Sequence, residues 1–316
     1  LFELQTRILE LFERLGVVPS HGYVNFHSIV PPGFGESTAF GSTPVCIYAN
    51  SVLGARCNFE GGPAALAAAF TGRVPRFGFH LDRCRRGSDL FAVEDRPRCP
   101  ADWSVLGALI GERLGSYWRV PVIEGVDGRP DAVELASLGA ALATFGSVAM
   151  FHMVGVTPEA PEPASAFHGS IPEPVVIRRV DIEAKYDSYG GLGEKLDVVV
   201  FGAPQLHFRE LAEIAERLDG RRIHKGTALL AFTSPEIKSQ CNRLGITGHI
   251  EAAGGLVVHG MEFFAIHPGE LARAKGWKRL MTNSAKLCQI LIGYGYAPVP
   301  APIGRCVDSA LKGRVL

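Results

Sequence analysis

Short apolar runs alternate with helical patterns along most of this 316-residue chain, and this alternation limits the folds it can adopt. We expect helices at residues 1–15, 63–70, 101–115, 131–145, 182–189, 208–218, 235–244 and 282–290, and strands at 45–49, 120–125, 148–154, 196–201, 228–232 and 255–258. Strands that alternate with helices of about 10–15 residues favour parallel sheets covered by helices. The sequence therefore predicts an α/β fold.

One proline-rich segment interrupts the alternation. Residues 157–174 (TPEAPEPASAFHGSIPEP) have no apolar periodicity, and such composition is typical of linkers between domains. We therefore predict a first α/β region at residues 1–160, a linker at 161–174, and a second α/β region at 175–316.

The charge balance limits the partners of the chain. It has 32 basic and 32 acidic side chains, whereas nucleic-acid binding requires a surplus of basic ones. It also contains no apolar, uncharged run of about 18 residues, and its acidic N-terminus is unlike a signal peptide. The seven cysteines lack the spacing of a zinc site. We expect a cytoplasmic protein with reduced thiols, without nucleic-acid or membrane partners.

The segment YANSVLGARCN, residues 48–58, places polar side chains directly after an expected strand. Ligands of open α/β sheets bind beyond the carboxyl ends of the strands, and an arginine suits a carboxylate or phosphate because its fork donates two parallel hydrogen bonds. Turn chemistry alone explains such a segment equally well. The predicted substrate-binding residues here are Asn50, Ser51, Arg56 and Asn58.

A second polar cluster, MTNSAK at residues 281–286, stands at an expected helix start. Thr282, Asn283 and Ser284 are residue types that cap helices. The same position also suits an anion held by helix N-terminal amides, with Lys286 one turn inside the helix. We predict substrate contacts for the first three residues and a catalytic role for Lys286.

Two further side chains are candidates for acid–base work. Glu36 lies in the glycine-rich sequence GFGE, residues 33–36, and His80 lies in FHLD, residues 79–82. Carboxyl and imidazole groups exchange protons at accessible pH. The basic residues that follow His80, Arg85 and Arg86, form either an ion-pair network or the wall of a site.

Read together, these stretches resemble the large subunit of the aconitase X family over residues 10–316. The matching stretches are PGFGES (32–37), YANSVLGARCN (48–58), EGGPAALAAAFTGRVPRFGFHLD (60–82), the run 138–161, FGAPQLHFREL (201–211) and MTNSAK (281–286). The resemblance implies aconitase-superfamily three-layer α/β domains and a hydro-lyase, since known members dehydrate cis-3-hydroxy-L-proline or mevalonate 5-phosphate. It also implies a small swivelling domain that carries a catalytic serine, as a separate subunit or fused outside this sequence.

The chain departs from the family at the cofactor. The family holds an iron–sulfur cluster through three cysteines, and alignment by flanking residues places Tyr23, Ala203 and Met261 at those positions. We therefore expect no cluster, and protein groups would replace its Lewis acidity. Arg56 and Lys286 would bind the substrate carboxylate, and Glu36 or His80 would protonate the leaving hydroxyl.

Three histidines stand near the lost cysteines and offer an alternative cofactor. His21, His207 and His259 would together bind a single Zn²⁺ or Fe²⁺. The expected function is a dehydratase or isomerase of a small hydroxy carboxylic or hydroxy amino acid. The alternatives are a different lyase, decarboxylase or cyclase reaction, and a non-catalytic metabolite-binding or scaffold protein.

Overall fold

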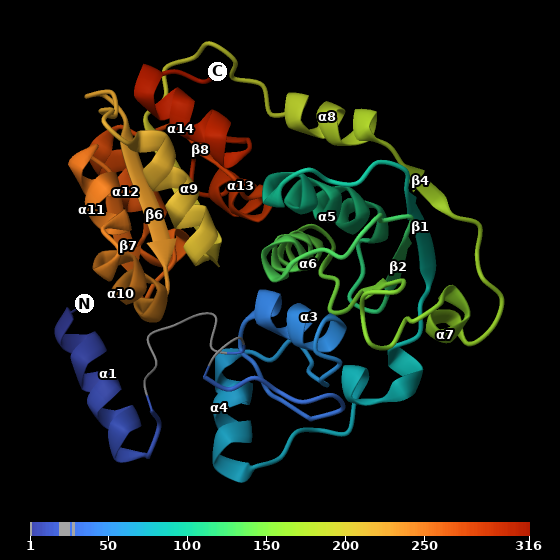
Figure 1. Cartoon of the computed structure of the whole chain (residues 1–316). Helices are drawn as coiled ribbons and strands as arrows, with labels where there is room; N and C mark the ends of the chain where they lie inside the picture. Colours follow the sequence, from blue (N-terminus) through green and yellow to red (C-terminus); the bar gives the residue numbers. More distant parts are fainter. Residues whose placement is uncertain (1, 19–25, 27–28) are drawn as a thin grey trace.

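The computed structural model describes residues 2–18, 26 and 29–316, which contain two parallel β-sheets covered by helices (Figure 1). The first sheet has the strand order β3-β2-β1-β4 and the second the order β7-β6-β5-β8-β9. The strands are β1 Asp89–Val93, β2 Pro121–Glu124, β3 His152–Met153, β4 Val175–Ile177, β5 Val198–Leu206, β6 Ala228–Thr233, β7 Leu256–His259, β8 Arg279–Thr282 and β9 Ala297–Pro300. Every pair within these sheets is parallel, which confirms the α/β prediction.

Helices connect the strands. The α-helices are α1 Phe2–Arg14, α3 Thr43–Ser51, α4 Gly62–Thr71, α5 Pro100–Leu114, α6 Ala132–Gly146, α7 Pro163–Phe167, α8 Arg179–Asp187, α9 Phe208–Leu218, α10 Pro235–Arg243, α11 Ile246–Ala252, α12 Pro268–Lys275, α13 Ala285–Ile292 and α14 Ile303–Lys312. The part of the chain that the structure describes also has three short 3₁₀ helices, η1 Gly78–His80, η2 Asp82–Cys84 and η3 Phe263–Ala265. Within the described residues, no helix combines the length and apolar character needed to cross a bilayer.

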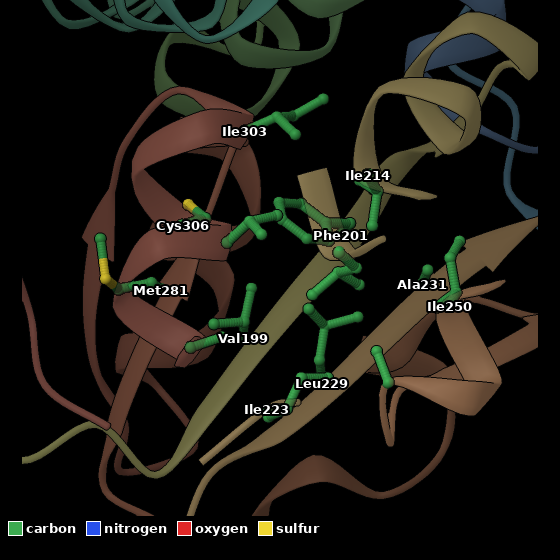
Figure 2. Packing of buried hydrophobic residues seen from close by; sticks show 14 of the residues in the cluster. Val199, Phe201, Ile214, Ile223, Leu229, Ala231, Ile250, Met281, Ile303 and Cys306 are labelled. Carbon is green, nitrogen blue, oxygen red and sulfur yellow. The ribbon is translucent and has the colours of Figure 1, made fainter. Parts of the chain in front are cut away.

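The second sheet is the middle of three layers. Successive side chains of a strand point to opposite faces, so the continuous apolar run of β5 supplies both cores. Val199 and Phe201 pack with α9, α11 and α14 (Figure 2). Val198 and Val200 pack on the other face with η3, α12 and α13. Burial on both faces explains why the parallel strands read as unbroken apolar runs.

The first sheet is covered in the same way. Phe91 and Ile123 belong to a core with residues of α3, α5 and α6, whereas Leu90 and Val122 face Phe167 of α7 on the other side. Helix α13 then joins the two units, of which the first is built on the sheet β1–β4 and the second on the sheet β5–β9. Its first residue, Ala285, packs against residues of α5 and α8, and its amide donates to Ser104 Oγ of α5 at 2.9 Å. The end of β8 is thereby fixed against the first unit.

The expected strand at 45–49 is wrong, because these residues lie in helix α3. Residues 45–51 are all buried, so the run shows no helical periodicity that would distinguish the two structures. Strand β3 is also shorter than expected, covering only 152–153. The Ala149 carbonyl and the Phe151 amide bond to the side chains of Asn50 and Ser51 instead of to a neighbouring strand.

Two other boundaries differ from the sequence analysis. The expected helix at 282–290 begins only at Ala285, and Thr282 is the last residue of β8. The segment 161–174 contains α7, and β4 after it pairs with β1. Both flanks of this segment therefore belong to the first sheet, and the chain passes between the sheets at residues 188–197, between α8 and β5.

Glycines allow α5 and α6 to approach closely, and this contact gives a stability prediction. A Cβ at Gly107 would lie 2.4 Å from the Leu138 carbonyl oxygen, which is backbone and cannot turn aside. Gly107→Ala is expected to lower the free energy of unfolding by about 1–3 kcal/mol in urea titrations. Gly248→Ala, in α11 with nothing within 4 Å of its Cβ, is the control and should stabilise by about 0.5–1 kcal/mol. Equal effects would contradict this interpretation.

Candidate active site

The carboxyl ends of β5 and β8 bring together most of the second polar cluster. Ser284 caps α13, because its Oγ accepts from the Leu287 amide at 3.2 Å and donates to the Ala203 carbonyl at 2.5 Å. Thr282 Oγ1 accepts from the Ser284 amide at 3.2 Å. Both hydroxyls therefore shape the loop between β8 and α13, which confirms the capping interpretation for Ser284. This loop directs Asn283 toward α9.

Asn283 meets a carboxyl group that the sequence analysis missed. Its Nδ2 donates to Glu210 Oε1 at 3.1 Å, and the His207 amide donates to Glu210 Oε2 at 2.9 Å. Glu210 is only 8% exposed, and burial raises its pKa from 4.5 to about 7. A carboxyl group with this pKa both holds and releases a proton near neutral pH, as a general acid or base requires.

Glu210 faces a narrow cavity between the two units. The cavity is lined by Ser104, Val133, Ala136 and Ser137 of the first unit and by Pro204, Gln205, His207, Glu210, Asn283 and Ser284 of the second. Asn283 also lines a wider groove of about 590 Å³ bordered by the starts of α5 and α14 and by Arg217 of α9. Asn283 therefore separates a solvent-facing groove from the buried carboxyl group.

Lys286 is buried one turn inside α13. It is 5% exposed, and its Nζ lies 5.3 Å from the centre of the Phe264 ring. Burial lowers the pKa of Lys286 and raises that of Glu262, while each of the two charges favours ionisation of the other. Gln205, near the end of β5, donates from its Nε2 to the carbonyl of Met261 at 3.1 Å. This hydrogen bond holds Glu262, the next residue, close to the end of β5. Lys286 thus places a buried amino group close to the end of β5.

The predicted residues of the segment 48–58 have other partners. Asn50 Nδ2 donates to the carbonyls of Cys57 and Ala149 at 2.8 and 2.9 Å, and its Oδ1 accepts from the Cys57 amide. Ser51 Oγ accepts from the Phe151 amide. Asn58 bridges the Phe77 carbonyl and the Phe79 amide. In this structure these three side chains hold distant backbone segments together.

Arg85 is the centre of this network, which supports the ion-pair interpretation. It is 3% exposed. Its guanidinium donates to both Glu159 carboxylate oxygens, to Asn50 Oδ1 and its carbonyl, and to the Phe79 carbonyl. The His152 ring contacts the Arg85 carbonyl at 2.7 Å. Arg85 therefore holds together the segments of the first unit that contain Asn50, Phe79 and Glu159.

Arg56, Glu36 and His80 lie together, apart from the β8–α13 loop. Arg56 donates to the His80 carbonyl at 3.0 Å and to Asp82 at 2.5 Å, and its amide donates to the Glu36 carbonyl. Glu36 is exposed and accepts from the Gly33 amide. Burial, together with Arg85 and Arg56, lowers the pKa of His80. Among the described residues, no hydrogen bond or ion pair joins these three side chains to Asn283 or Lys286.

The family's cluster positions carry no thiol in the described part of the chain. Ala203, within β5, is fully buried, and Met261, after β7, is 39% exposed. Methyl and thioether groups do not replace the three thiolates of a cluster site. Tyr23 and His21 lie outside the described residues. His207 is half-buried and His259 exposed, and no group of three His, Cys, Asp or Glu suited to a metal occurs among the residues described.

The raised pKa of Glu210 predicts a pH-dependent stability. Between pH 4.5 and about 7 the folded chain retains a proton that the unfolded chain has lost, so stability falls as pH rises through this window, by about 3 kcal/mol in total. Gln mimics the protonated group, and Glu210→Gln should be the more stable protein by about 2–3 kcal/mol near pH 8 and by less than about 1 kcal/mol near pH 5.

Urea titrations at both pH values test this expectation. Glu216→Gln is the matched control, because Glu216 lies on the same helix and is exposed. Its replacement should change stability by less than about 1 kcal/mol at either pH. A Glu210→Gln effect of the same size at both pH values would show that the carboxyl group is already ionised below neutral pH.

Known protein families and relatives match nearly the whole length of this chain. Models of the aconitase X first, second and third domains match residues 1–83, 87–187 and 196–312. The phosphomevalonate dehydratase large subunit of Thermococcus kodakarensis is 32% identical over 93% of this chain and 73% of its own length. The cis-3-hydroxy-L-proline dehydratase of Pseudomonas aeruginosa is 36% identical over 89% of this chain and 48% of its own length, so the chain spans about half of that relative.

A solved structure agrees with the same grouping. The crystal structure of Thermococcus kodakaraensis aconitase X in its holo form has a TM-score of 0.86 and 30% identity to this chain. It covers 98% of this chain, which spans 77% of the solved one. The similarity therefore includes both sheets and the helices between them.

Proposed function

Because the chain belongs to the aconitase X family, we propose that it is the large catalytic part of a hydro-lyase. Its substrate is a small hydroxy carboxylic or hydroxy amino acid, the class to which the named substrates of its dehydratase relatives belong. The single observation that carries this proposal is the buried Glu210 at the cavity between the units, with a pKa of about 7.

Removal of water requires a base for a carbon-bound proton and an acid for the leaving hydroxyl. We assign the acid to Glu210, which retains its proton near neutral pH and is oriented by Asn283. Lys286 is the candidate cation for the substrate carboxylate, because it is buried near the same strand end. The serine that the family places on its small domain acts as the base that removes the proton from carbon. The carbon-bound proton then passes to the serine, the C–O bond breaks, and the departing hydroxyl takes the Glu210 proton and leaves as water.

We propose further that this chemistry proceeds without an iron–sulfur cluster. Support comes from the residues at the three family positions, since Tyr23, Ala203 and Met261 offer no thiolate. A protein acid at Glu210 then takes over the protonation of the leaving group. Neither of the two proton transfers, to the serine and from Glu210, requires a metal.

The proposed partner is a small swivelling domain that closes over the Asn283 groove. Several relatives are named large subunits, and the Pseudomonas relative is about twice as long as the part that this chain matches. Both facts support an additional domain, separate or fused. The groove of about 590 Å³ beside Asn283 is open to receive it.

The test is a dehydration assay of the chain together with its small partner. Phosphomevalonate and cis-3-hydroxy-L-proline are the first substrates, followed by other hydroxy acids, and a visible spectrum of the same sample records iron–sulfur absorption. Turnover without that absorption supports the proposal. Binding without turnover of any hydroxy acid would favour a metabolite-binding role, and stoichiometric iron with sulfide would overturn the cluster-free mechanism.

A further inference from the structure

Two of the seven cysteines lie in direct contact in the first unit. Cys46 of α3 and Cys57 of the segment 48–58 have their Sγ atoms 3.5 Å apart, and both side chains are fully buried. Asn50, one turn after Cys46, binds the amide and the carbonyl of Cys57. Among all seven cysteines, which fall within the described residues, this is the one sulfur–sulfur hydrogen bond. The backbone thus holds both thiols in place.

The backbone of Phe40 contacts both sulfurs. The Phe40 amide donates to Cys57 Sγ at 3.4 Å, and Cys46 Sγ donates to the Phe40 carbonyl at 3.0 Å. The residues just before it, Ser37, Thr38 and Ala39, line a groove of about 360 Å³ against α4. This groove therefore reaches the residues that directly precede the Phe40 contact with the two sulfurs.

The two thiols have unequal acidity. Hydrogen bonding with Cys46, followed by that with the Phe40 amide, lowers the pKa of Cys57, whereas contact with Cys57 and burial raise the pKa of Cys46. A thiolate is the reactive form of cysteine. Cys57 is thus suited to attack first, and Cys46 to resolve the product.

We propose that Cys46 and Cys57 form a reversible dithiol–disulfide pair that is oxidised by peroxide. The Cys57 thiolate attacks one peroxide oxygen, the O–O bond breaks, hydroxide leaves, and Cys57 becomes a sulfenic acid. Cys46, on losing its proton, attacks the Cys57 sulfur and displaces the second hydroxide. Two thiols and one hydrogen peroxide give one disulfide and two waters. The new bond ties α3 to the residue that Asn50 already binds.

Mass spectrometry of the native chain tests the proposal. After hydrogen peroxide treatment, alkylation under denaturing conditions and digestion, the expected product is a disulfide-linked peptide pair that dithiothreitol separates. Trypsin cleaves after Arg56, so Cys46 and Cys57 fall in different peptides and their linkage is read directly. The proposal is wrong if both thiols remain alkylatable under peroxide that oxidises the half-buried Cys84.

Three variants sharpen the result. Cys46→Ser and Cys57→Ser should each abolish the linked pair and leave the remaining thiol to collect oxygen adducts. Cys84→Ser should leave the pair unchanged. A linked peptide involving Cys57 that persists in Cys46→Ser would show that another thiol is the partner. The wild-type measurement decides the question even if a serine variant does not fold.

Discussion

Replacement of Arg85 by Met is expected to lower the free energy of unfolding by about 3–5 kcal/mol. Met fills a similar volume but leaves Glu159 without its cation and the Asn50 and Phe79 carbonyls without their donor. The Glu159 side chain is 23% exposed, whereas that of Arg85 is 2% exposed. Water therefore hydrates the carboxylate in part, and most of the loss in the free energy of unfolding comes from the buried carbonyls that lack a donor.

Urea titration measures this loss, and two further variants isolate its origin. Arg86→Met changes the adjacent, exposed arginine and should alter stability by no more than about 0.5 kcal/mol. The double variant Arg85→Met with Glu159→Gln should recover part of the loss, because it removes the unpaired carboxylate. If Arg85→Met costs no more than Arg86→Met, the network does not stabilise the first unit.

The periodic elements of the fold were predictable, and those decided by tertiary contacts were not. Helix α9 matches its expected range of 208–218, since its apolar residues recur at helical spacing before the buried β6. Helix α3 was read as a strand because all of its residues from Val45 to Ser51 are buried. Strand β1 was missed because its five residues carry little pattern, and its identity depends on pairing with β2 and β4.

The site was located by its motif but not by its chemistry. The sequence MTNSAK does mark the end of β8, yet its partner Glu210 is 73 residues from Asn283 in sequence. One local signal was available, since a carboxylate three residues after His207 at a helix start is the capping-box pattern. That pattern predicts a surface cap, and only the packing of the two units against each other buries the carboxyl group and raises its pKa.

The assignment of Glu210 predicts a large loss of turnover in Glu210→Gln. A positioned general acid contributes about 10²–10⁴-fold to rate. Gln keeps the shape of Glu210 and, with the Asn283 amide turned so that its oxygen accepts, the contact between the two side chains, but it has no acidic proton to give. We expect kcat of the complex with its small partner to fall by that factor, while KM changes little. Glu216→Gln, at an exposed position of α9, should retain wild-type turnover.

The pH profile distinguishes an acid from a merely structural carboxyl group. With Glu210 as proton donor, wild-type kcat is highest below its pKa of about 7 and falls about tenfold per pH unit above it. The residual activity of Glu210→Gln should lack this decline, because the titrating group is gone. An unchanged decline in the variant would assign the acid to another residue, and activity that rises with pH in the wild type would make Glu210 a base. Since stability and turnover then depend on the same proton, the variant that is more stable near pH 8 is also the one that loses catalysis.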